Sequence, residues 1–479
     1  MDRETLGARA MAVPRVEQVR QVLAGTPAWL VGGAVRDVAL GRELNDLDLA
    51  VVGDPKGPAK AIAAALGGVA FELSEEFPAW RAKDREDGWQ VDVAALRDPG
   101  GRIEVDLGLR DFTVGAVAVS FEDGAAVDPL GGLEDLGVGL IRACGPTSFS
   151  DDPLRLMRAA RLVAQFGWRI DPETMELARE SAPEAASPAG ERILAELVLL
   201  IGARDPLAGL EAMDRLGLFD SVLPEIGALH GVIQGPNHHL DVYGHTMEVV
   251  EGMLRIESDL EAFTGDRAVE VSDFLSQPLA DGATRATALR LGALFHDVAK
   301  PETRSEGDGF VSFRGHDEAG AERIKERFKA LRASRRLISY LADLTRHHLV
   351  LGFMVPSMPL DRRQVYDYLD RTDPVQIDVT LLTVADRLAA RGTATIAGEE
   401  MVAGHLELAR QMVGHGLDWA RDGRPGQFLP GDELATELGI ARGPRLGAVM
   451  AELAAARYSG EIHDATEAVE HARSFLRAE

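Results

Sequence analysis

The chain has 479 residues, enough for two to four domains at about 100–200 residues per domain. Hydrophobic residues make up 46% and charged residues 27%, which excludes a wholly disordered chain, a collagen-like fibre and a coiled-coil rod. The net charge of −26 repels nucleic acid on average, so any RNA contact must use a local basic cluster. Two such clusters occur, at residues 155–161 and 323–336, and a solvated helix face is the simpler interpretation of either.

No apolar stretch is long and charge-free enough to span a bilayer, so we expect no membrane partner. The first residues lack a basic patch followed by an apolar core, so we expect no signal peptide. The one cysteine, Cys144, cannot form an internal disulfide. Chain length and cysteine usage together favour the reducing cytosol, and a cytoplasmic location is expected.

The first ~140 residues mix strand and helix signals, which is typical of an α+β or α/β domain. Strands are predicted at 28–31, 48–52, 90–94 and 113–121, and a helix is predicted at 58–66. After about residue 150 the strand signals nearly vanish. Asp151-Asp152-Pro153 predicts a helix start, with an acidic cap and proline in the first turn, and amphipathic helices follow to the end. Residues 263–285 are polar and contain glycine, so a loop is predicted there.

Two aspartates separated by one residue, Asp46 and Asp48, lie at the start of the second predicted strand. Side chains alternate between the faces of a strand, so both carboxylates point to the same side. Adjacent carboxylates repel each other unless a cation lies between them, and Mg²⁺ prefers such oxygen ligands together with substrate phosphates. The pair therefore indicates a Mg²⁺ site for a phosphorylated substrate, although a D-x-D sequence alone is more often a loop edge or a helix cap.

Three further features accompany this pair. Gly32 and Gly33 follow the first predicted strand and let the backbone approach a triphosphate, and Arg36 lies within the next helical turn, where it can contact phosphate. Asp92 is a lone acid in an apolar alternating run and supplies a third carboxylate from a neighbouring strand. Three carboxylates, two metal ions and a nucleoside triphosphate make a phosphoryl-transfer site, in which the metals activate a hydroxyl and stabilise the leaving pyrophosphate.

These motifs resemble those of a known family. G-G-x-x-R-D at residues 32–37, followed by the D-x-D pair, resembles the nucleotidyltransferase head of the bacterial, class II tRNA CCA-adding enzymes and their poly(A) polymerase relatives. Arg110 and Asp111 begin R-D-F-T, which resembles the family motif R-R-D-F-T-x-N-A, associated with the ribose. Segments 128–142, 151–161 and 191–197 resemble the next motifs in order. Five ordered motifs over most of the chain make the resemblance specific.

Segment 151–161 resembles the E-D-x-x-R helix that reads the incoming base in that family. Asp152 and Arg155 are three residues apart and share a face if both lie on a helix. A carboxylate accepts and a guanidinium donates, so the pair matches the edge of a base, and the resemblance implies that C and A are accepted. Arg158 and Arg161 fall near that face and are expected to hold phosphates. An intrahelical salt bridge is the alternative explanation of the same spacing.

The sequence departs from the family pattern at three positions. Leu109 replaces the first arginine of R-R-D, and Gly115 replaces the usual asparagine. Asp151 replaces the usual glutamate, which is a mild change. We expect the first two changes to affect ribose or loop positioning, and with it the choice of nucleotide, more than the chemistry.

The second half of the chain contains histidines and aspartates in the order H…HD…D. The residues are His245, His296, Asp297 and Asp386, and imidazole with carboxylate suits a transition-metal or mixed Mg²⁺/Mn²⁺ site. This order resembles the HD phosphohydrolase superfamily, which hydrolyses phosphate esters with metal-bound water. His316 adds a ligand or a substrate contact in this interpretation. Two roles stay open for this part: an active phosphohydrolase, or a body that holds tRNA.

The resemblance implies an α+β fold with four parts: a mixed-sheet nucleotidyltransferase head at 1–145, a helical RNA-binding neck at 146–235, an HD domain at 236–395 and a helical tail at 396–479. It implies template-independent addition of C, A or CCA to the 3′ end of tRNA from CTP and ATP, catalysed by Asp46, Asp48 and Asp92 with Mg²⁺. It also implies a second metal site at the HD residues, which would take a divalent transition metal or Mg²⁺. The implied nucleotide-binding residues are Gly32, Gly33, Arg36, Arg110, Asp111, Asp152, Arg155, Arg158 and Arg161.

Other enzymes share these motifs. A poly(A) polymerase, or an enzyme that adds only CC or only A, has the same head residues and cannot be separated by motif. The alternative from a different class is a metal-dependent HD phosphohydrolase whose head only binds RNA or a nucleotide. The oligomeric state is not predicted by the sequence.

Overall fold

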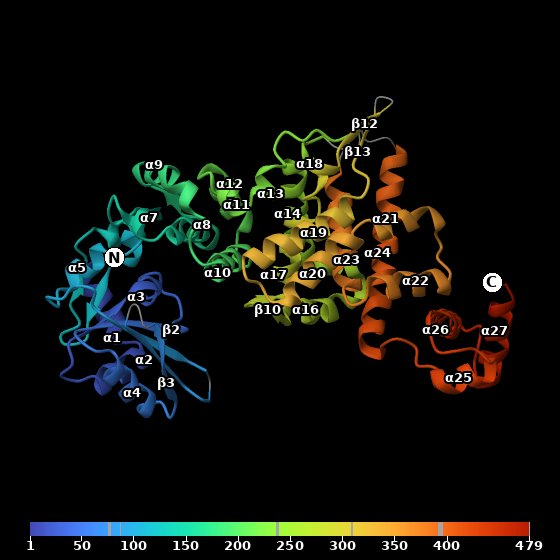
Figure 1. The fold of residues 1–479 in the computed structure, drawn as a ribbon. Helices are drawn as coiled ribbons and strands as arrows, with labels where there is room; N and C mark the ends of the chain where they lie inside the picture. The colour runs from blue at the N-terminus through green and yellow to red at the C-terminus, as the bar shows by residue number, and fades with distance from the viewer. Residues whose placement is uncertain (75–77, 87, 236–238, 308–309, 391–395, 479) are drawn as a thin grey trace. The chain divides into compact units, whose positions relative to one another are not determined.

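The computed structural model describes residues 1–74, 78–86, 88–235, 239–307, 310–390 and 396–478 (Figure 1). The chain forms two compact units, Met1–Val222 and Leu223–Glu479. The first combines a seven-stranded sheet with helices and the second is almost entirely helical, which confirms the α+β prediction. Among the described residues, no helix has the length and apolarity needed to cross a bilayer. The division into four smaller domains stays a prediction.

The sheet of the first unit has the order β3-β4-β5-β2-β1-β6-β7. Its strands are β1 (Ala28–Val31), β2 (Asp46–Val51), β3 (Val69–Ser74), β4 (Ala79–Lys83), β5 (Gln90–Ala95), β6 (Ala118–Ser120) and β7 (Ala126–Val127). Only β2 and β5 pair in parallel, and every other neighbouring pair is antiparallel. The prediction of a mixed sheet is therefore confirmed, with the parallel pair at its centre.

The two central strands follow from their side-chain pattern. In β2, Leu47 and Leu49 are buried while Asp46 is exposed, so burying the leucine face turns both aspartates to the other face. Helix α3 (Gly32–Ala39) begins directly after β1 and buries Ala34 and Val35 against the sheet. The sheet and the packing of α3 against it therefore fix the positions of both aspartates and of the turn at Gly32.

The remaining elements of the first unit are mostly helices. They are α1 (Arg3–Met11), α2 (Pro14–Val22), α4 (Lys56–Ala65), α5 (Ile103–Gly108), α6 (Gly132–Val138), α7 (Ser148–Asp151), α8 (Leu154–Phe166), α9 (Pro172–Ser181), α10 (Gly190–Ile201), α11 (Pro206–Arg215) and α12 (Leu218–Val222), with the short strands β8 (Leu140–Ile141) and β9 (Arg169–Ile170). Helix α8 packs against α10 and α11 through its buried apolar face.

In the second unit, five helices pack around a common core: α14 (Val242–Ser258), α17 (Arg285–Phe295), α19 (His316–Ala330), α20 (Arg335–His347) and α23 (Gln376–Ala389). The other elements are α13 (Pro224–Gly227), α15 (Leu260–Thr264), α16 (Ala268–Ser276), α18 (Lys300–Thr303), α21 (Val350–Met354), α22 (Arg362–Thr372), α24 (Ile396–Asp422), α25 (Gly431–Leu438), α26 (Pro444–Ser459) and α27 (Ala465–Ala478), with the hairpins β10 (Pro278–Ala280) to β11 (Ala283–Thr284) and β12 (Ser305–Gly307) to β13 (Phe310–Ser312). The last three helices enclose a small core of their own around Leu434, Val449 and Ala472.

Three local predictions were wrong. The strand predicted at 113–121 is a 3₁₀ turn, Thr113–Gly115, followed by the short β6. The loop predicted at 263–285 contains α16 and the β10–β11 hairpin, because the apolar side chains of Val271 and Leu275 are buried in the core. Strands β3 and β4 were missed, although Val69, Phe71 and Leu73 alternate with other residues in the pattern of a strand; all three side chains are exposed on the edge strand β3.

The sharp entry to α6 gives a stability test. A methyl group at Gly132 would clash with the carbonyl oxygen of Thr113 and lie 2.8 Å from the Val117 side chain, whereas Gly137 in the same helix has open space. We expect Gly132→Ala to destabilise the chain by about 1–3 kcal/mol. Gly137→Ala should be neutral or stabilising by up to about 1 kcal/mol. Urea unfolding of the full chain measures both, and equal effects would contradict the packing argument.

Candidate functional site

The three predicted catalytic carboxylates lie together on the central strands. The register of the parallel pair places Asp48 directly beside Asp92, and Asp46 lies two residues earlier on the same face of β2. The sequence had predicted that the third carboxylate would come from a neighbouring strand, and the structure places it there. A cluster of three acids from two adjacent strands is the arrangement that binds a divalent cation.

The carboxylates disturb one another's ionisation. Burial, followed by the negative charges of Asp46 and Asp92, raises the pKa of Asp48 to about 6. Burial and the charges of Asp92 and Asp37 also raise the pKa of Asp46. A divalent cation at this position would offset the repulsion, so the donor set fits a bound metal ion.

Asp92 has a partner that the sequence did not reveal. Arg81 lies directly opposite on β4, and its Nε and Nη2 donate to the two carboxylate oxygens of Asp92, each at 2.7 Å. The prediction missed Arg81 because β4 was not recognised as a strand. Since both oxygens of Asp92 already accept from the guanidinium, Asp46 and Asp48 are the stronger candidates for metal ligands.

The glycine pair is required by the close approach of Asp48. Gly32 has φ +67°, and a Cβ there would lie 3.1 Å from a carboxylate oxygen of Asp48 and 3.2 Å from Nη1 of Arg110. The backbone amide of Gly33 donates to the Asp48 carboxylate, which lowers the pKa against the larger effect of burial. The close backbone approach that the sequence predicted is therefore present, and its nearest partner in this structure is the carboxylate of Asp48, which the sequence predicts to be catalytic.

A cavity of about 260 Å³ opens beside the acids. Of the predicted residues, those that line it are Gly32, Gly33, Arg36, Asp48, Asp92, Arg110, Asp111, Arg158 and Arg161. The cavity thus combines carboxylates on one wall with four arginines, which is the charge pattern expected for a metal-bound triphosphate.

The arginines of the cavity are fixed by acidic partners. Nε of Arg158 lies 3.0 Å from Asp111, and Nε of Arg161 lies 2.7 Å from Glu196 on α10. Although burial opposes its ionisation, the Arg158 guanidinium holds the pKa of Asp111 below its usual value. Each guanidinium keeps its other nitrogens, so it can still donate to a phosphate.

The base-reading pair is arranged differently from the prediction. Asp152 is not on the helix: its backbone is extended, at φ −149°, between α7 and α8, and its carboxylate accepts from Arg192 at 2.9 Å. The Arg155 guanidinium is buried and donates to the carbonyl oxygens of Leu109, Arg110 and Ser148. Neither side chain lines the cavity, because the break at Pro153 starts α8 only at residue 154.

The departure at position 109 is compensated through the backbone. Leu109 is 42% exposed, and its carbonyl oxygen accepts from Arg97 at 3.0 Å and from Arg155 at 2.8 Å. Arg97 also donates to Asp106, which in turn contacts Arg110. The loop that carries Arg110 is therefore held without the missing arginine side chain. Gly115, the other departure, lines the cavity and leaves extra space beside Asp111.

The four predicted HD ligands converge inside the second unit. Nε2 of His245 lies 3.0 Å from Asp386 and 3.5 Å from Asp297, and Nε2 of His296 lies 3.1 Å from Asp297. Both histidines and Asp297 are at most 2% exposed. Although burial opposes ionisation, the neighbouring imidazoles keep the pKa of both carboxyls low, through His296 at Asp297 and His245 at Asp386. Buried imidazoles and carboxylates at these separations fit a divalent transition metal.

Further groups complete this cluster. His316 and His348 lie beside Asp297, at 3.3 Å and 3.9 Å from its Oδ1. Burial and the charge of His296 lower the pKa of His348 to about 4, so its imidazole is neutral near pH 7. Lys300, one helical turn after Asp297, donates to its Oδ2 at 2.6 Å. The sequence had proposed His316 as an additional ligand, whereas the position of His348 depends on the packing of α20.

Comparison with known proteins agrees with this division. Residues 28–142 match the model of the poly A polymerase head domain, residues 167–229 the probable RNA- and SrmB-binding site of polymerase A, and residues 242–391 the HD domain. An A-adding tRNA nucleotidyltransferase of Deinococcus radiodurans is 35% identical over 92% of this chain and 94% of its own length. A CC-adding tRNA nucleotidyltransferase of Thermus thermophilus is 32% identical, over 94% of this chain and 93% of its own.

The chain belongs to the bacterial tRNA nucleotidyltransferase family. Its fold is shared with a CCA-adding enzyme in an apo form, with a TM-score of 0.65 at 20% identity over 99% of this chain and 97% of that one. A Thermotoga maritima CCA-adding enzyme complexed with tRNA is also similar, with a TM-score of 0.59 at 21% identity and 99% of each chain covered.

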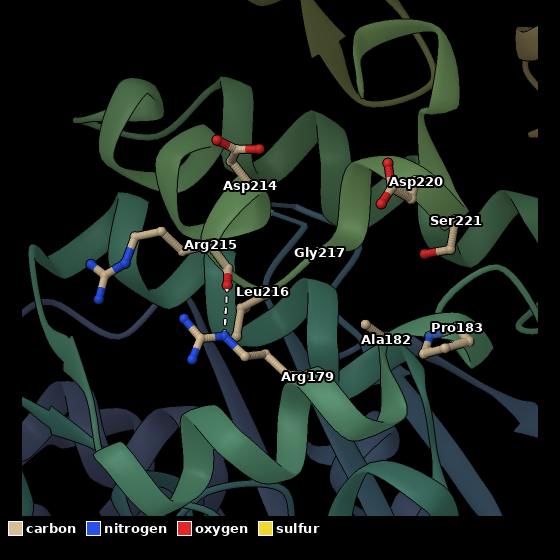
Figure 2. A pocket seen from close by; sticks show the side chains of 9 residues that line it. All are labelled: Arg179, Ala182, Pro183, Asp214, Arg215, Leu216, Gly217, Asp220 and Ser221. Carbon is tan, nitrogen blue, oxygen red and sulfur yellow. Dashed lines mark hydrogen bonds between the residues drawn. The ribbon is translucent and has the colours of Figure 1, made fainter. Parts of the chain in front are cut away.

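A second hollow of this tRNA nucleotidyltransferase lies in the segment that matches the RNA-binding model. It has a volume of about 630 Å³, and Figure 2 shows Arg179 and Arg215 on one side of it with Asp214 and Asp220 nearby. Arg179 donates to the carbonyl oxygen of Arg215 at 3.0 Å. The hollow is larger than the cavity beside Asp48 but has acids dispersed among its arginines, so it is the weaker candidate for a triphosphate site.

Three of the seven basic residues in the cluster at 323–336 pair with acids. Arg323 pairs with Glu302 at 2.7 Å, Lys325 with Glu322 at 2.7 Å, and Arg327 with Glu225 at 2.8 Å. For these three residues the interpretation of a solvated helix face is favoured over that of an RNA-binding strip.

The raised pKa of Asp48 makes a stability prediction. Its folded-state pKa of about 6 exceeds the ordinary 3.8, so the folded chain binds the proton more tightly and loses stability as pH rises from 4 through 6. We expect Asp48→Asn to stabilise the metal-free chain at pH 7.5, by at most about 3 kcal/mol, and to have little effect at pH 4. Urea unfolding with chelator measures this. A variant less stable than the parent at pH 7.5 would contradict the assignment.

Proposed function

We propose that the chain is a template-independent tRNA nucleotidyltransferase that adds C, A or both to the 3′ end of tRNA from CTP and ATP. The observation that carries the proposal is the cluster of three carboxylates on β2 and β5, beside a glycine turn and an arginine-lined cavity. The names of the relatives that match over more than nine-tenths of the chain support the same substrate class. A cytoplasmic location, expected from the cysteine usage, stays a prediction.

In this proposal Asp46 and Asp48 hold Mg²⁺, which supplies charge neutralisation and favours a deprotonated hydroxyl. Arg110 and Arg158, which line the same cavity as Asp48, bind the triphosphate, and Arg36 adds a further contact from α3. The tRNA 3′-hydroxyl oxygen loses its proton to solvent and attacks the α-phosphorus, which forms a phosphodiester bond. The bond from the α-phosphorus to the oxygen that bridges to the β-phosphorus breaks, and pyrophosphate leaves with that electron pair. Arg81 keeps the Asp92 carboxylate oriented beside Asp48.

Base choice is assigned to the region around Asp152. Its carboxylate, held by Arg192, remains an acceptor that a base amino group can reach, whereas Arg155 acts as a positioning residue for the Leu109–Arg110 backbone. The relatives that match most of the chain are named A-adding or CC-adding, while those named multifunctional CCA protein match 67% of it. We therefore favour addition of part of CCA, and the greater similarity to the A-adding relative favours A.

A primer-extension assay tests the proposal. Full-length protein with Mg²⁺ is given tRNA lacking CCA, tRNA ending in C and tRNA ending in CC, with CTP, ATP or both. We expect a single A on tRNA ending in CC, and Asp46→Ala should reduce incorporation by at least about 10³-fold because the metal site is lost.

The outcomes separate the alternatives. Two C residues added to tRNA lacking CCA would make the chain a CC-adding enzyme, three residues a full CCA-adding enzyme, and long A-tails a poly(A) polymerase. No incorporation on any primer would reject the transferase. Arg179→Ala, which removes an arginine of the second hollow outside the cavity beside Asp48, is a control and should give the wild-type products.

We also propose a second function, a metal-dependent phosphohydrolase in the HD unit. Its support is the set of six histidine and aspartate side chains, five of them buried, because an exposed tRNA-holding surface has no need of a buried metal centre. Lys300 beside Asp297 supplies a fixed positive charge for a substrate phosphate.

Two variants separate the two activities. The metal is Mn²⁺ or Ni²⁺ and the probe is bis(p-nitrophenyl) phosphate. The Asp46→Ala variant should hydrolyse this probe at the wild-type rate, although it is inactive in primer extension. His296→Ala should lose hydrolysis by at least about 10²-fold, because a metal ligand is removed, and keep primer extension. Absence of hydrolysis by the parent protein with either metal would leave the HD unit as a tRNA-holding body.

A further inference from the structure

The face of the sheet that carries the acids continues beyond the cavity beside Asp48. The strand residues that line that cavity belong to β1, β2 and β5. The cross-strand register extends the same row outwards, because Arg81 on β4 lies opposite Asp92 and Phe71 on β3 lies opposite Arg81. Directly opposed residues share a face, so Phe71 lies on the face of the acids. With strands about 4.8 Å apart, β3 is about 14 Å from β2 on this face.

This outer part of the face is exposed, apolar and basic. Val69 and Phe71 of β3 are 41% and 43% exposed. Lys83, opposite Val69 in the register, is exposed as well. Arg81 uses two of its five N–H donors on Asp92, so three donors remain outside that pair. The outer face therefore presents aromatic and aliphatic surface beside two positive charges.

The opposite face of the same strands is covered by α4. This helix packs against both β3 and β4, and Nζ of Lys56 and of Lys60 lies 5.2 Å and 5.9 Å from the centre of the Trp80 ring. Trp80 precedes Arg81 in β4, so the two side chains point to opposite faces. The exposed apolar side chain of Phe71 thus lies on the side of the acids, where a substrate can reach it.

The chemistry of the proposed transfer requires a second substrate on this side. In an in-line displacement, the attacking and the leaving oxygen lie on opposite sides of the phosphorus. Two arginines that would hold the leaving pyrophosphate gather at the β1 side: Nη1 of Arg110 lies 3.2 Å from where a Cβ of Gly32 would be, and Arg36 follows in α3. The sheet order β3-β4-β5-β2-β1 then places the attacking 3′-hydroxyl towards β5 and β4.

We infer that Val69, Phe71, Arg81 and Lys83 form a platform for the single-stranded 3′ end of the acceptor RNA. A base stacks on Phe71, and backbone phosphates lie beside the two cations. The inference rests on the proposed nucleotidyl transfer and adds the position of its second substrate. Aromatic side chains that stack with bases, next to cations that follow the backbone, are the pattern of single-strand binding surfaces.

The distance along the sheet indicates which nucleotide contacts Phe71. A stacked strand advances about 3.4 Å per nucleotide, so a base about 14 Å from the acids lies at most about four nucleotides from the 3′ end. A second copy of the chain is the other occupant to consider, because β3 is an edge strand. Edge pairing uses the backbone of β3 and has no need of the two cations, so RNA is favoured.

The test compares Phe71→Ala and Phe71→Trp in the full chain. Fluorescence anisotropy gives the Kd for tRNA ending in CC, and primer extension gives the KM values for tRNA and ATP. Phe71→Ala should raise the Kd and the KM for tRNA at least about fivefold, because one stacked base is lost, and should leave the KM for ATP unchanged. Phe71→Trp keeps an aromatic face and should bind tRNA at least as tightly as the parent protein.

Two controls locate the contact. Glu72→Gln changes the next residue of β3, which lies opposite Trp80 on the covered face, and should keep the parent Kd. On tRNA shortened by the last four nucleotides, the parent protein and Phe71→Ala should bind equally. Lys83→Ala should reduce the slope of log Kd against log salt by about 0.7, the value for one phosphate of a single strand.

The outcomes separate this inference from the proposed function. An unchanged tRNA Kd for Phe71→Ala, or an equal loss on full-length and shortened tRNA, would overturn the platform and leave the transferase intact. No primer extension by the parent protein would reject the transferase, and the Kd comparison would still decide the platform. If the parent protein is a dimer that Phe71→Ala converts to monomers with an unchanged tRNA Kd, the face is an interface between copies and the inference is wrong.

Discussion

The repulsion between acceptor groups held close together is the constraint on which both sites depend. In the first unit, the parallel pairing of β2 and β5 places Asp48 beside Asp92, and burial, followed by the charges of Asp46 and Asp92, raises the pKa of Asp48. In the second unit, carbonyl oxygens fix the rings of His316 and His348 so that their lone pairs face each other. In both places the packing of the rest of the unit offsets the electrostatic cost of bringing these groups together, and a bound cation would reduce that cost.

Arginine is used in the first unit to balance these acids without occupying the metal position. Arg81 donates to both oxygens of Asp92, and Arg158 pairs with Asp111, so these two acids beside the cavity are held in fixed orientations. A planar guanidinium can bind a carboxylate with one edge and keep other donors for phosphate, which an ammonium group does less well. The overall negative charge of the chain is therefore compatible with an anionic substrate, because positive charge gathers where the cavity opens.

Several predictions were correct because they rest on short-range rules. The alternating pattern of β2 correctly predicted that Asp46 and Asp48 lie on one face. The alternating apolar run around Asp92 correctly predicted a strand, but it did not show how that strand pairs with β2. Others failed where tertiary contacts decide. Arg81 was missed because the short segment Ala79–Lys83 was not recognised as a strand. Asp152 was expected on the helix with Arg155, but Pro153 delays the start of α8 to residue 154. His348 carried no local signal, since a histidine at the end of an amphipathic helix is common without a ligand role.

By itself, the sequence determined the α+β class, the paired aspartates with their glycine turn, and the H…HD…D order, because strand periodicity and residue chemistry are local properties. The tertiary structure alone decided that β5 is the parallel neighbour of β2, that Arg155 supports a loop in place of facing the cavity, and that α19 and α20 bring His316 to His348. The physical reason is that strand order and helix packing depend on which apolar faces are buried together. No spacing in the chain encodes that choice.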